Sequence, residues 1–372
     1  MTSIIYVGMD VHTTNYTLCC YSMEDDRFFA EVQVEPDAKN ILKYLARIEK
    51  QQSRDCRIVC GYEAGCLGYS LYHQLHAHGI DCVILAPTTM MTKPGKRIKT
   101  DRRDARLISK CLAFHTYSPV YIPTEVDDAV KEYIRMRDDA NSALARVKQQ
   151  IIAFCIRHGK IHDGKSYWTN KHLEWLSSLD LGNKILSEVL QEYLIRYYQL
   201  REQVDMYDMR INELAQAEPY RQKVEKLGCF RGIAAHTALS FCVEVGDFRR
   251  FATAQQFAPY LGLVPGECSS GDKQQYTGIT KAGNSHLRKL LVETAQVFGR
   301  SATKSGKSVA LKERQAKCDS LTVAYADKAN ARLKKKYFKI AMRSKVNIAK
   351  TAVAREMACF IWGMMTDNIS CA

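Results

Sequence analysis

Short apolar runs, separated by turns and helical segments, fill the first 90 residues of the chain. Runs bounded by turn residues are typical of strands, whereas apolar residues three and four positions apart are typical of helices. The pattern predicts strands at 4–9, 16–22, 28–34, 57–62 and 82–86, and helices at 37–50 and 68–78. Gly79 stands where a helix commonly ends, and Pro87 stops the last strand. This order of elements predicts a mixed sheet flanked by helices.

From residue 126 onward the apolar spacing becomes that of long helices. Apolar positions in 130–154 and again in 193–214 step alternately by three and four residues, with Arg137 and Ala140 as breaks in the first series. Two such heptad seams predict an antiparallel coiled-coil hairpin. The seams could serve only the packing of the two helices on each other, or could also pair two copies of the chain, and the sequence leaves both open. Between the helices, residues 158–185 are polar and contain glycines, which indicates a loop or a small helical insert.

The remaining third of the chain is predicted to be mainly helical. Residues 224–300 contain two helices, a glycine-rich loop and a further helix from about Ser285. A basic helix at 327–343 and an apolar helix at 346–365 follow. The chain is therefore predicted to have three domains, at 1–125, 126–220 and 221–372.

Positive charge is concentrated near the end of the chain. Lys and Arg number 54 against 40 Asp and Glu, a net of +14, and residues 300–355 alone hold 16 basic and 3 acidic residues. Such a field attracts polyanions, because contacts to phosphates release counterions. The alternative is a solvated basic face that only aids solubility. The nucleic-acid-binding candidates here are Lys334, Lys335 and Lys336.

Composition excludes several classes of protein. A chain of 372 residues with 46% hydrophobic and 25% charged residues has the balance of a folded globular protein. No apolar stretch reaches the roughly 18 residues that a membrane span needs, and no basic leader precedes Asp10, so we expect neither a span nor a signal peptide. The 14 cysteines form no C-x-x-C pair and lie mostly in apolar runs. They indicate buried free thiols and a cytoplasmic protein.

Four carboxylates form the strongest chemical signal. Asp10 ends the first predicted strand and Glu63 the fourth, and the element order is that of the RNase H-like fold, in which these strands are neighbours. Asp101 and Asp104 are spaced i, i+3 in KTDRRDA and so share one helix face. Mg²⁺ prefers oxygen ligands, and two such ions clamp the attacking and leaving oxygens of a phosphodiester. Each acid has a plainer alternative: Asp10 could be a turn residue and Asp101 a helix N-cap. Together they predict a site for two Mg²⁺ ions.

Basic residues crowd the approach to Asp101. Seven bases fall within fourteen residues, more than two neighbouring acids need for charge compensation. A phosphate backbone passing the metal site would account for them. They are Lys93, Lys96, Arg97, Lys99, Arg102, Arg103 and Arg106.

A second chemical candidate is the pair Ser269–Ser270 before Gly271. Glycines permit close approach of a phosphate to the backbone, and Lys281 and Arg288 are near in sequence as possible charge stabilisers. A serine hydroxyl there could be a nucleophile. By residue type alone, such a segment is more often only a turn.

Several long motifs make the chain resemble the DEDD-type insertion-sequence transposases, the family numbered one-ten, described as bridge-RNA-guided recombinases. The resemblance runs essentially from end to end. It is carried by VGMDVH at 7–12, GYEAGCLGYSLYHQL at 61–75, KTDRRDA at 99–105, YLGLVPGECSSG at 260–271, GITKAGNSHLRKLLVE at 278–293 and VAREMACFIWGM at 353–364.

The resemblance implies a fold, a site and partners. It implies an RNase H-like, resolvase-like domain that carries Asp10, Glu63, Asp101 and Asp104, then a coiled coil, then a C-terminal domain with a serine nucleophile. By motif position that serine is Ser270, with Ser269 as the fallback. It also implies that acids from one subunit and the serine from another cut DNA through a phosphoserine link. A guide RNA from the element would pair with donor and target DNA. The expected assembly is a homodimer, and a tetramer at synapsis.

Three other functions compete with this interpretation. A junction-resolving nuclease would use the same metal site with water as nucleophile and would not need Ser270. A sugar- or acetate-kinase-type ATP-binding protein is suggested by GMDVHTTNYTL, but the second glycine-rich phosphate loop that it requires is absent from the sequence. A non-catalytic nucleic-acid-binding protein leaves the four acids unexplained, because they would only repel DNA.

Overall fold

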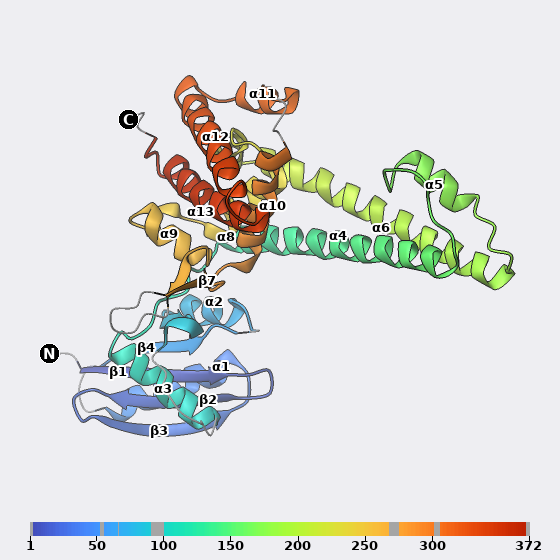
Figure 1. Ribbon diagram of the computed structural model, residues 1–372. Helices are drawn as coiled ribbons and strands as arrows, with labels where there is room; N and C mark the ends of the chain where they lie inside the picture. The colour runs from blue at the N-terminus through green and yellow to red at the C-terminus, as the bar shows by residue number, and fades with distance from the viewer. Residues whose placement is uncertain are drawn as a thin grey trace. The chain divides into compact units, whose positions relative to one another are not determined.

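The chain forms two compact units, each described here by itself. The computed structural model describes residues 3–52, 56–65, 67–90, 100–267, 275–300 and 306–369. The first unit is Met1–Ile122 and the second is Pro123–Ala372. Figure 1 shows the sheet of the first unit and the helices of the second.

A five-stranded mixed sheet forms the centre of the first unit. Its strands are β1 (Ser3–Val11), β2 (Tyr16–Ser22), β3 (Arg27–Val34), β4 (Cys56–Glu63) and β5 (Asp81–Leu85), in the order β3-β2-β1-β4-β5. Strands β1 to β3 pair antiparallel, whereas β1, β4 and β5 pair parallel. The predicted mixed sheet, with all five of its strands, is therefore confirmed.

Helices cover both faces of this sheet. Helices α1 (Ala38–Gln51) and α2 (Ser70–Ala77) pack on one face, and α3 (Asp101–Ala113) packs on the other, while a short 3-10 turn, η1 (Pro87–Thr89), follows β5. Alternation along β1 decides which residue faces which helix: Val7 and Met9 join the core with α1 and α2, and Tyr6 joins the core with α3. Residues two positions apart on β1 thus share a face.

Two glycines let α3 lie close against the sheet. A Cβ at Gly8 would stand 2.1 Å from the carbonyl oxygen of Ala105 and 2.4 Å from the amide nitrogen of Ser109. Its register partner in β4 is Gly61, where a Cβ would meet Leu112 at 2.8 Å. Only glycine fits where another backbone approaches this closely. The contact fixes where α3 crosses β1, two residues before Asp10.

Two long antiparallel helices extend from the second unit. They are α4 (Glu125–Arg157) and α6 (Lys184–Gln216), with α5 (Asn170–Ser177) near their far end (Figure 1). Contacts such as Tyr133–Tyr207 and Phe154–Tyr193 set the antiparallel alignment. Arg137, the polar break in the first seam, donates from Nε and Nη2 to the two carboxylate oxygens of Asp208 at 2.7 and 3.0 Å. Both predicted long helices are present.

The rest of the second unit is a helical body around one core. Its elements are α7 (Arg221–Gly228), α8 (Ala235–Val245), η2 (Phe248–Arg250), α9 (Ala254–Tyr260), β6 (Pro265–Glu267), β7 (Tyr276–Ile279), α10 (Ser285–Arg300), α11 (Val309–Gln315), α12 (Ser320–Ala341) and α13 (Val346–Met365). Phe241, Phe298 and Met357 are fully buried in a core that also takes Val130 and Ile211 from the long helices. The predicted separation of 126–220 from 221–372 stays a prediction. No helix in the described part of the chain is both long and apolar enough to cross a membrane.

The basic helix was predicted to start seven residues too late. We predicted 327–343, but α12 begins at Ser320, because Asp319 caps it. The Asp319 carboxylate accepts hydrogen bonds from the amide nitrogen of Thr322 at 2.8 Å and from its hydroxyl at 2.7 Å. An aspartate at this position satisfies amides that the first turn leaves unpaired.

Candidate metal centre and nucleic-acid interface

A cluster of charged side chains lies where β1 runs into its hairpin with β2. Asp10 is on the α3 face of β1, as Gly8 is. His12 is the first residue after β1, and its imidazole contacts Asp10. The hairpin is closed by a hydrogen bond from the His12 amide to the carbonyl oxygen of Asn15, at 3.0 Å. Asp101 is the first residue of α3 and Asp104 lies in its first turn. The crossing of α3 over Gly8 therefore brings both acids toward Asp10.

Three of these side chains converge closely. Single donor atoms of Asp10, His12 and Asp101 all lie within 4.8 Å of one another. His12 Nε2 is 3.2 Å from Asp10 Oδ2 and 4.0 Å from Asp101 Oδ1. The Asp10 side chain is 15% exposed, and those of His12 and Asp101 are each 47% exposed. The cluster is thus open to solvent on the side of His12 and Asp101.

The electrostatics of Asp10 fit a cation site. Burial raises the pKa of Asp10 above its ordinary value, His12 opposes this rise, and the charges of Asp101 and Asp104 add to it. Burial and the two neighbouring carboxylates thus disfavour the ionised form of Asp10 in the metal-free protein. A divalent cation among these oxygen and nitrogen donors would supply that charge. The residues present therefore fit a metal.

Glu63 occupies the predicted place at the neighbouring strand end. The register pairs Met9 with Tyr62, so Asp10 and Glu63 follow at the same edge of the sheet. Glu63 is exposed, and its carboxylate is outside the three-atom group formed by Asp10, His12 and Asp101. The structure therefore brings Asp101 and Asp104 near Asp10, whereas the role of Glu63 as a metal ligand stays a prediction.

Sequence reasoning gave His12 no role. The residue lies inside VGMDVH, but the charge pattern of the carboxylates drew attention to Asp10 alone. The signal that could have found it is its position two residues after Asp10, where the chain leaves the predicted strand. Asp10 and His12 share a hydrogen bond in the structure.

The basic residues near α3 are partly neutralised. Arg102 Nε lies 3.3 Å from one carboxylate oxygen of Glu31, on β3, and Arg106 Nε donates to the other at 2.6 Å. Two of the seven bases are thus paired with Glu31 and not with the acids of the proposed metal site, and Arg103 is exposed on the same helix. The predicted residues Lys93, Lys96, Arg97 and Lys99 lie outside the described residues.

The candidate nucleophile also lies outside the described residues. Ser269 and Ser270 belong to 268–274, between strands β6 and β7. After β7, Lys281 is exposed with a φ of 56°, and Arg288 Nη1 donates to the carbonyl oxygens of Leu261 and Ala282 at 3.0 and 3.1 Å. Arg288 therefore holds the backbone that leads into α10. Its proposed contact with phosphate stays a prediction, as does that of Lys281.

A half-buried polar cluster, which the sequence did not reveal, ties α4, α8 and α10 together. We use the term polar cluster for Asp138, His236, Glu244 and His286. Asp138 Oδ1 lies 2.9 Å from His236 Nε2, and its Oδ2 lies 2.8 Å from His286 Nε2. The other ring nitrogen of His286 lies 3.2 Å from Glu244 Oε1. Asn284, just before α10, donates to Glu244 Oε2 at 2.9 Å. The start of α10 is thereby anchored to α4 and α8.

Charges within the polar cluster stabilise one another. Burial alone would lower the pKa of His286, but hydrogen bonds to Asp138 and Glu244 raise it to about 9. Burial alone would raise the pKa of Asp138 and of Glu244, but their bonds to the histidines, with the charges of Arg137 and Arg135, hold both pKa values below the ordinary range. The folded protein therefore favours a protonated His286 between two ionised carboxylates.

The polar cluster predicts a loss of stability at high pH. Because the pKa of His286 is higher in the folded than in the unfolded protein, protonation of His286 stabilises the fold. This contribution to the unfolding free energy is complete below the ordinary pKa of about 6.5 and is lost as the pH rises through about 9. We expect the second unit to lose about 3 kcal/mol of unfolding free energy between pH 6 and pH 10 through this group. Urea unfolding of the His286→Gln variant should show a weaker dependence over that interval. An unchanged slope in the variant would contradict the assignment.

Part of the charge on α12 is also paired within the protein. Lys336 Nζ lies 2.6 Å from Glu356 on α13, and Arg332 pairs with the same carboxylate, which is 12% exposed. Lys335 is exposed and Lys334 is half-buried. Of the three predicted nucleic-acid-binding lysines, Lys336 is therefore also part of the packing of α12 on α13.

Comparison with known proteins gives matches over most of the chain. A model for DEDD transposases of the IS110 group, described as a transposase, matches residues 7–156, and a model described as the transposase IS116/IS110/IS902 family matches residues 225–314. The first range contains all four predicted acids, and the second contains Ser269 and Ser270.

Individual relatives match over 71% to 95% of their lengths. A putative transposase, y4qE, of Sinorhizobium fredii is 36% identical over 307 residues, which is 82% of this chain and 75% of that protein. The transposase for insertion sequence element IS1533 of Leptospira borgpetersenii is 32% identical over 340 residues, 90% of this chain and 95% of that protein. The transposase for element IS1111A of Coxiella burnetii is 26% identical over 268 residues, covering 68% and 71%.

Proposed function

Because this chain belongs to the IS116/IS110/IS902 family of transposases, we propose that it excises and inserts its own mobile element by cutting and exchanging DNA strands through a phosphoserine intermediate. It is a DNA transposase by family. The observation that supports the chemistry best is the convergence of Asp10, His12 and Asp101, at a place where burial raises the pKa of Asp10 and the charges of Asp101 and Asp104 add to that rise. DNA cleavage at such a site needs a cation to offset those charges.

The four acids are the proposed ligands of that cation. Asp10, Asp101 and Asp104 come from β1 and α3, and Glu63 comes from the neighbouring strand end. Two Mg²⁺ ions are the proposed occupants, and when bound they would supply positive charge to the scissile phosphate. The chain's own contribution is to hold the ligands in place through the close contact of α3 with Gly8.

Ser270 is the proposed nucleophile. Its Oγ forms a bond to the phosphorus of the scissile phosphodiester, the phosphorus–oxygen bond to one deoxyribose breaks, and the released sugar oxygen takes up a proton. The serine proton passes to a base in the site. The linkage keeps the energy of the broken bond available for rejoining a different DNA end. In the proposed arrangement the acids of one subunit act on the serine of another, with Lys281 and Arg288 as stabilisers of phosphate charge.

Nucleic acid is also the proposed partner of the basic segments. Residues 300–355 contain 16 basic and 3 acidic residues. This positive charge supports contacts to the phosphates of donor DNA, target DNA and an element-encoded bridge RNA. Base pairing with that RNA would select the DNA sites. The protein is proposed to act in the cytoplasm on nucleoid DNA, which agrees with the free cysteines found among the described residues.

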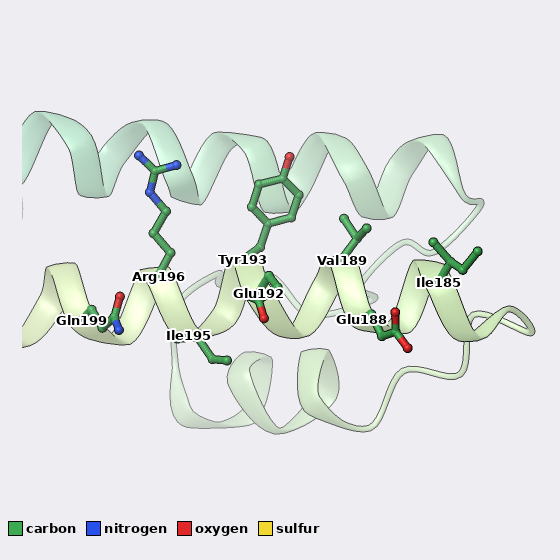
Figure 2. A pocket seen from close by; sticks show the side chains of 8 residues that line it. All are labelled: Ile185, Glu188, Val189, Glu192, Tyr193, Ile195, Arg196 and Gln199. Carbon is green, nitrogen blue, oxygen red and sulfur yellow. The ribbon is translucent and has the colours of Figure 1, made fainter.

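Self-association through α6 is the proposed basis of a homodimer that forms a tetramer at synapsis. Figure 2 shows a hollow on α6 lined by Ile185, Val189 and Ile195 together with charged neighbours. These three side chains are 68%, 37% and 50% exposed. Glu192 and Arg196 line the same hollow one helical turn apart, so an antiparallel second copy of α6 would place opposite charges face to face. Sedimentation equilibrium of the intact protein measures the mass directly.

A covalent-adduct assay tests the serine chemistry. Protein purified with RNA transcribed from its flanking element would be mixed with labelled junction DNA and Mg²⁺, and the products separated on a denaturing gel. We expect a protein-linked DNA band that the Ser270→Ala variant loses completely while still binding DNA. The Ser269→Ala variant is the matched control and should keep the band.

The same gel distinguishes the competing nuclease. Cleavage without a protein-linked band, at an equal rate in the Ser270→Ala variant, would mean that water is the nucleophile. The residues around Ser270 would then serve binding and not bond breaking.

A further inference from the structure

We propose that His12 is a direct nitrogen ligand in the cation site and that it makes this site prefer Mn²⁺ over Mg²⁺. The inference rests on the proposed metal centre and adds to it a ligand outside the four acids. It arises from one juxtaposition: a hairpin residue and the first residue of α3 both direct a donor atom at the carboxylate of Asp10.

His12 is the first residue after β1 and opens the turn to β2. Its imidazole lies beside Asp10, which stands on the face of β1 covered by α3, with Nε2 3.2 Å from Asp10 Oδ2. The bond from the His12 amide to Asn15 leaves only Thr13 and Thr14 at the tip of the hairpin. Because the imidazole already lies beside Asp10 in the metal-free protein, a metal that binds there needs little rearrangement of His12.

The spacing of the donor atoms matches a shared coordination shell. Ligands at about 2.1 Å from a six-coordinate ion lie roughly 3 Å apart when adjacent and roughly 4.2 Å apart when opposite. The His12 nitrogen is 3.2 Å from Asp10 Oδ2 and 4.0 Å from Asp101 Oδ1. These separations are close to the adjacent and the opposite values. A cation could therefore contact all three atoms with small side-chain movements.

A nitrogen ligand changes which cation the site favours. Mg²⁺ selects oxygen donors and keeps much of its water, whereas imidazole suits first-row transition metals. Mn²⁺ is the transition-metal ion whose preference for oxygen ligands is nearest to that of Mg²⁺, so a carboxylate site with one imidazole suits it. A site of three carboxylates alone would bind Mg²⁺ and Mn²⁺ similarly. With His12 as a ligand, the site should bind Mn²⁺ more tightly than Mg²⁺. This difference in affinity should disappear when the imidazole is removed.

Pulsed electron paramagnetic resonance of bound Mn²⁺ tests the ligand directly. Electron spin-echo envelope modulation detects a ¹⁴N nucleus bonded to the ion, without any need for catalysis. We expect the full-length protein to show this nitrogen modulation and the His12→Gln variant to lose it. Titration should show that the variant binds Mn²⁺ about ten- to a hundredfold more weakly while its affinity for Mg²⁺ changes little.

Two controls separate this inference from the proposed metal centre. His76→Gln alters an exposed histidine on α2 of the same unit and should leave the modulation intact. Asp10→Asn should abolish Mn²⁺ binding. If Mn²⁺ binds in an Asp10-dependent way but shows no nitrogen modulation, or modulation that His12→Gln leaves unchanged, the ligand role of His12 is wrong and the metal centre stands. If Mn²⁺ binding is absent or unaffected by Asp10→Asn, the metal centre itself fails.

Discussion

Replacing Asp10 by asparagine should reduce DNA cleavage at least about a thousandfold while leaving the first unit fully folded. Asp10 is the acid that the others surround, and an amide cannot balance the charge of a cation as a carboxylate does. Its pKa is raised by burial and by Asp101 and Asp104, so its ionised form is unfavourable in the metal-free fold. We therefore expect the metal-free variant to melt at the same temperature as the unaltered protein, or a little higher.

Thermal melting with and without divalent cation checks both halves of this expectation. Mg²⁺ or Mn²⁺ should raise the melting temperature of the unaltered protein and have no effect on Asp10→Asn, because a ligand stabilises only the state that binds it. Glu49→Gln removes an exposed carboxylate from α1 and is the matched control, with normal cleavage and a normal response to metal. A variant at Asp10 that melts much earlier without metal would show a structural role instead.

The second large effect is expected at Gly8. A methyl group there would meet the backbone of Ala105 and of Ser109, and backbone atoms cannot rotate away as a side chain can. Gly8→Ala should therefore push α3 off β1 and cost about 3 kcal/mol of unfolding free energy, the upper part of the range for overpacked cores. The displacement would also carry Asp101 away from Asp10, so metal affinity should fall even in molecules that remain folded.

Gly65→Ala supplies the comparison within the same unit. A Cβ at Gly65 would have its nearest neighbour at 3.9 Å, an ordinary contact. That variant should keep the unfolding free energy within about 0.5 kcal/mol of the original. Urea unfolding followed by Mn²⁺ titration on both variants measures the two effects separately. Equal stability of the two variants would mean that α3 does not pack on Gly8 as described.

The sheet and its acids could be predicted because both depend on local pattern and on connectivity. Apolar runs bounded by turns located the strands, and the parallel pairing of β1 with β4 follows from the crossover helix between them. Parallel strands end at the same edge, so Asp10 and Glu63 had to be neighbours there. The position of α3 could not be predicted in this way. It depends on the close approach of the α3 backbone to Gly8, which the spacing of apolar residues does not reveal.

The polar cluster could not be predicted, because its members are far apart in sequence. Asp138 and His286 are separated by 148 positions, and each alone looks like an ordinary surface residue of a helix. Only tertiary packing of α4 against α8 and α10 makes them partners. His12 was missed for a different reason, since its distance to Asp101 depends on where α3 begins.

The anchoring of α10 has a mechanical consequence. Helix α4 has 33 residues, and those beyond Asp138 form an arm roughly 30 Å long at 1.5 Å per residue. Asp138 on α4 contacts both His236 on α8 and His286 on α10, so both helices are attached to the same point along α4. The start of α10, which follows β7, therefore cannot shift along α4 without breaking the contact between Asp138 and His286. The long hairpin and the helix that follows β7 are thus joined at one fixed point of the second unit.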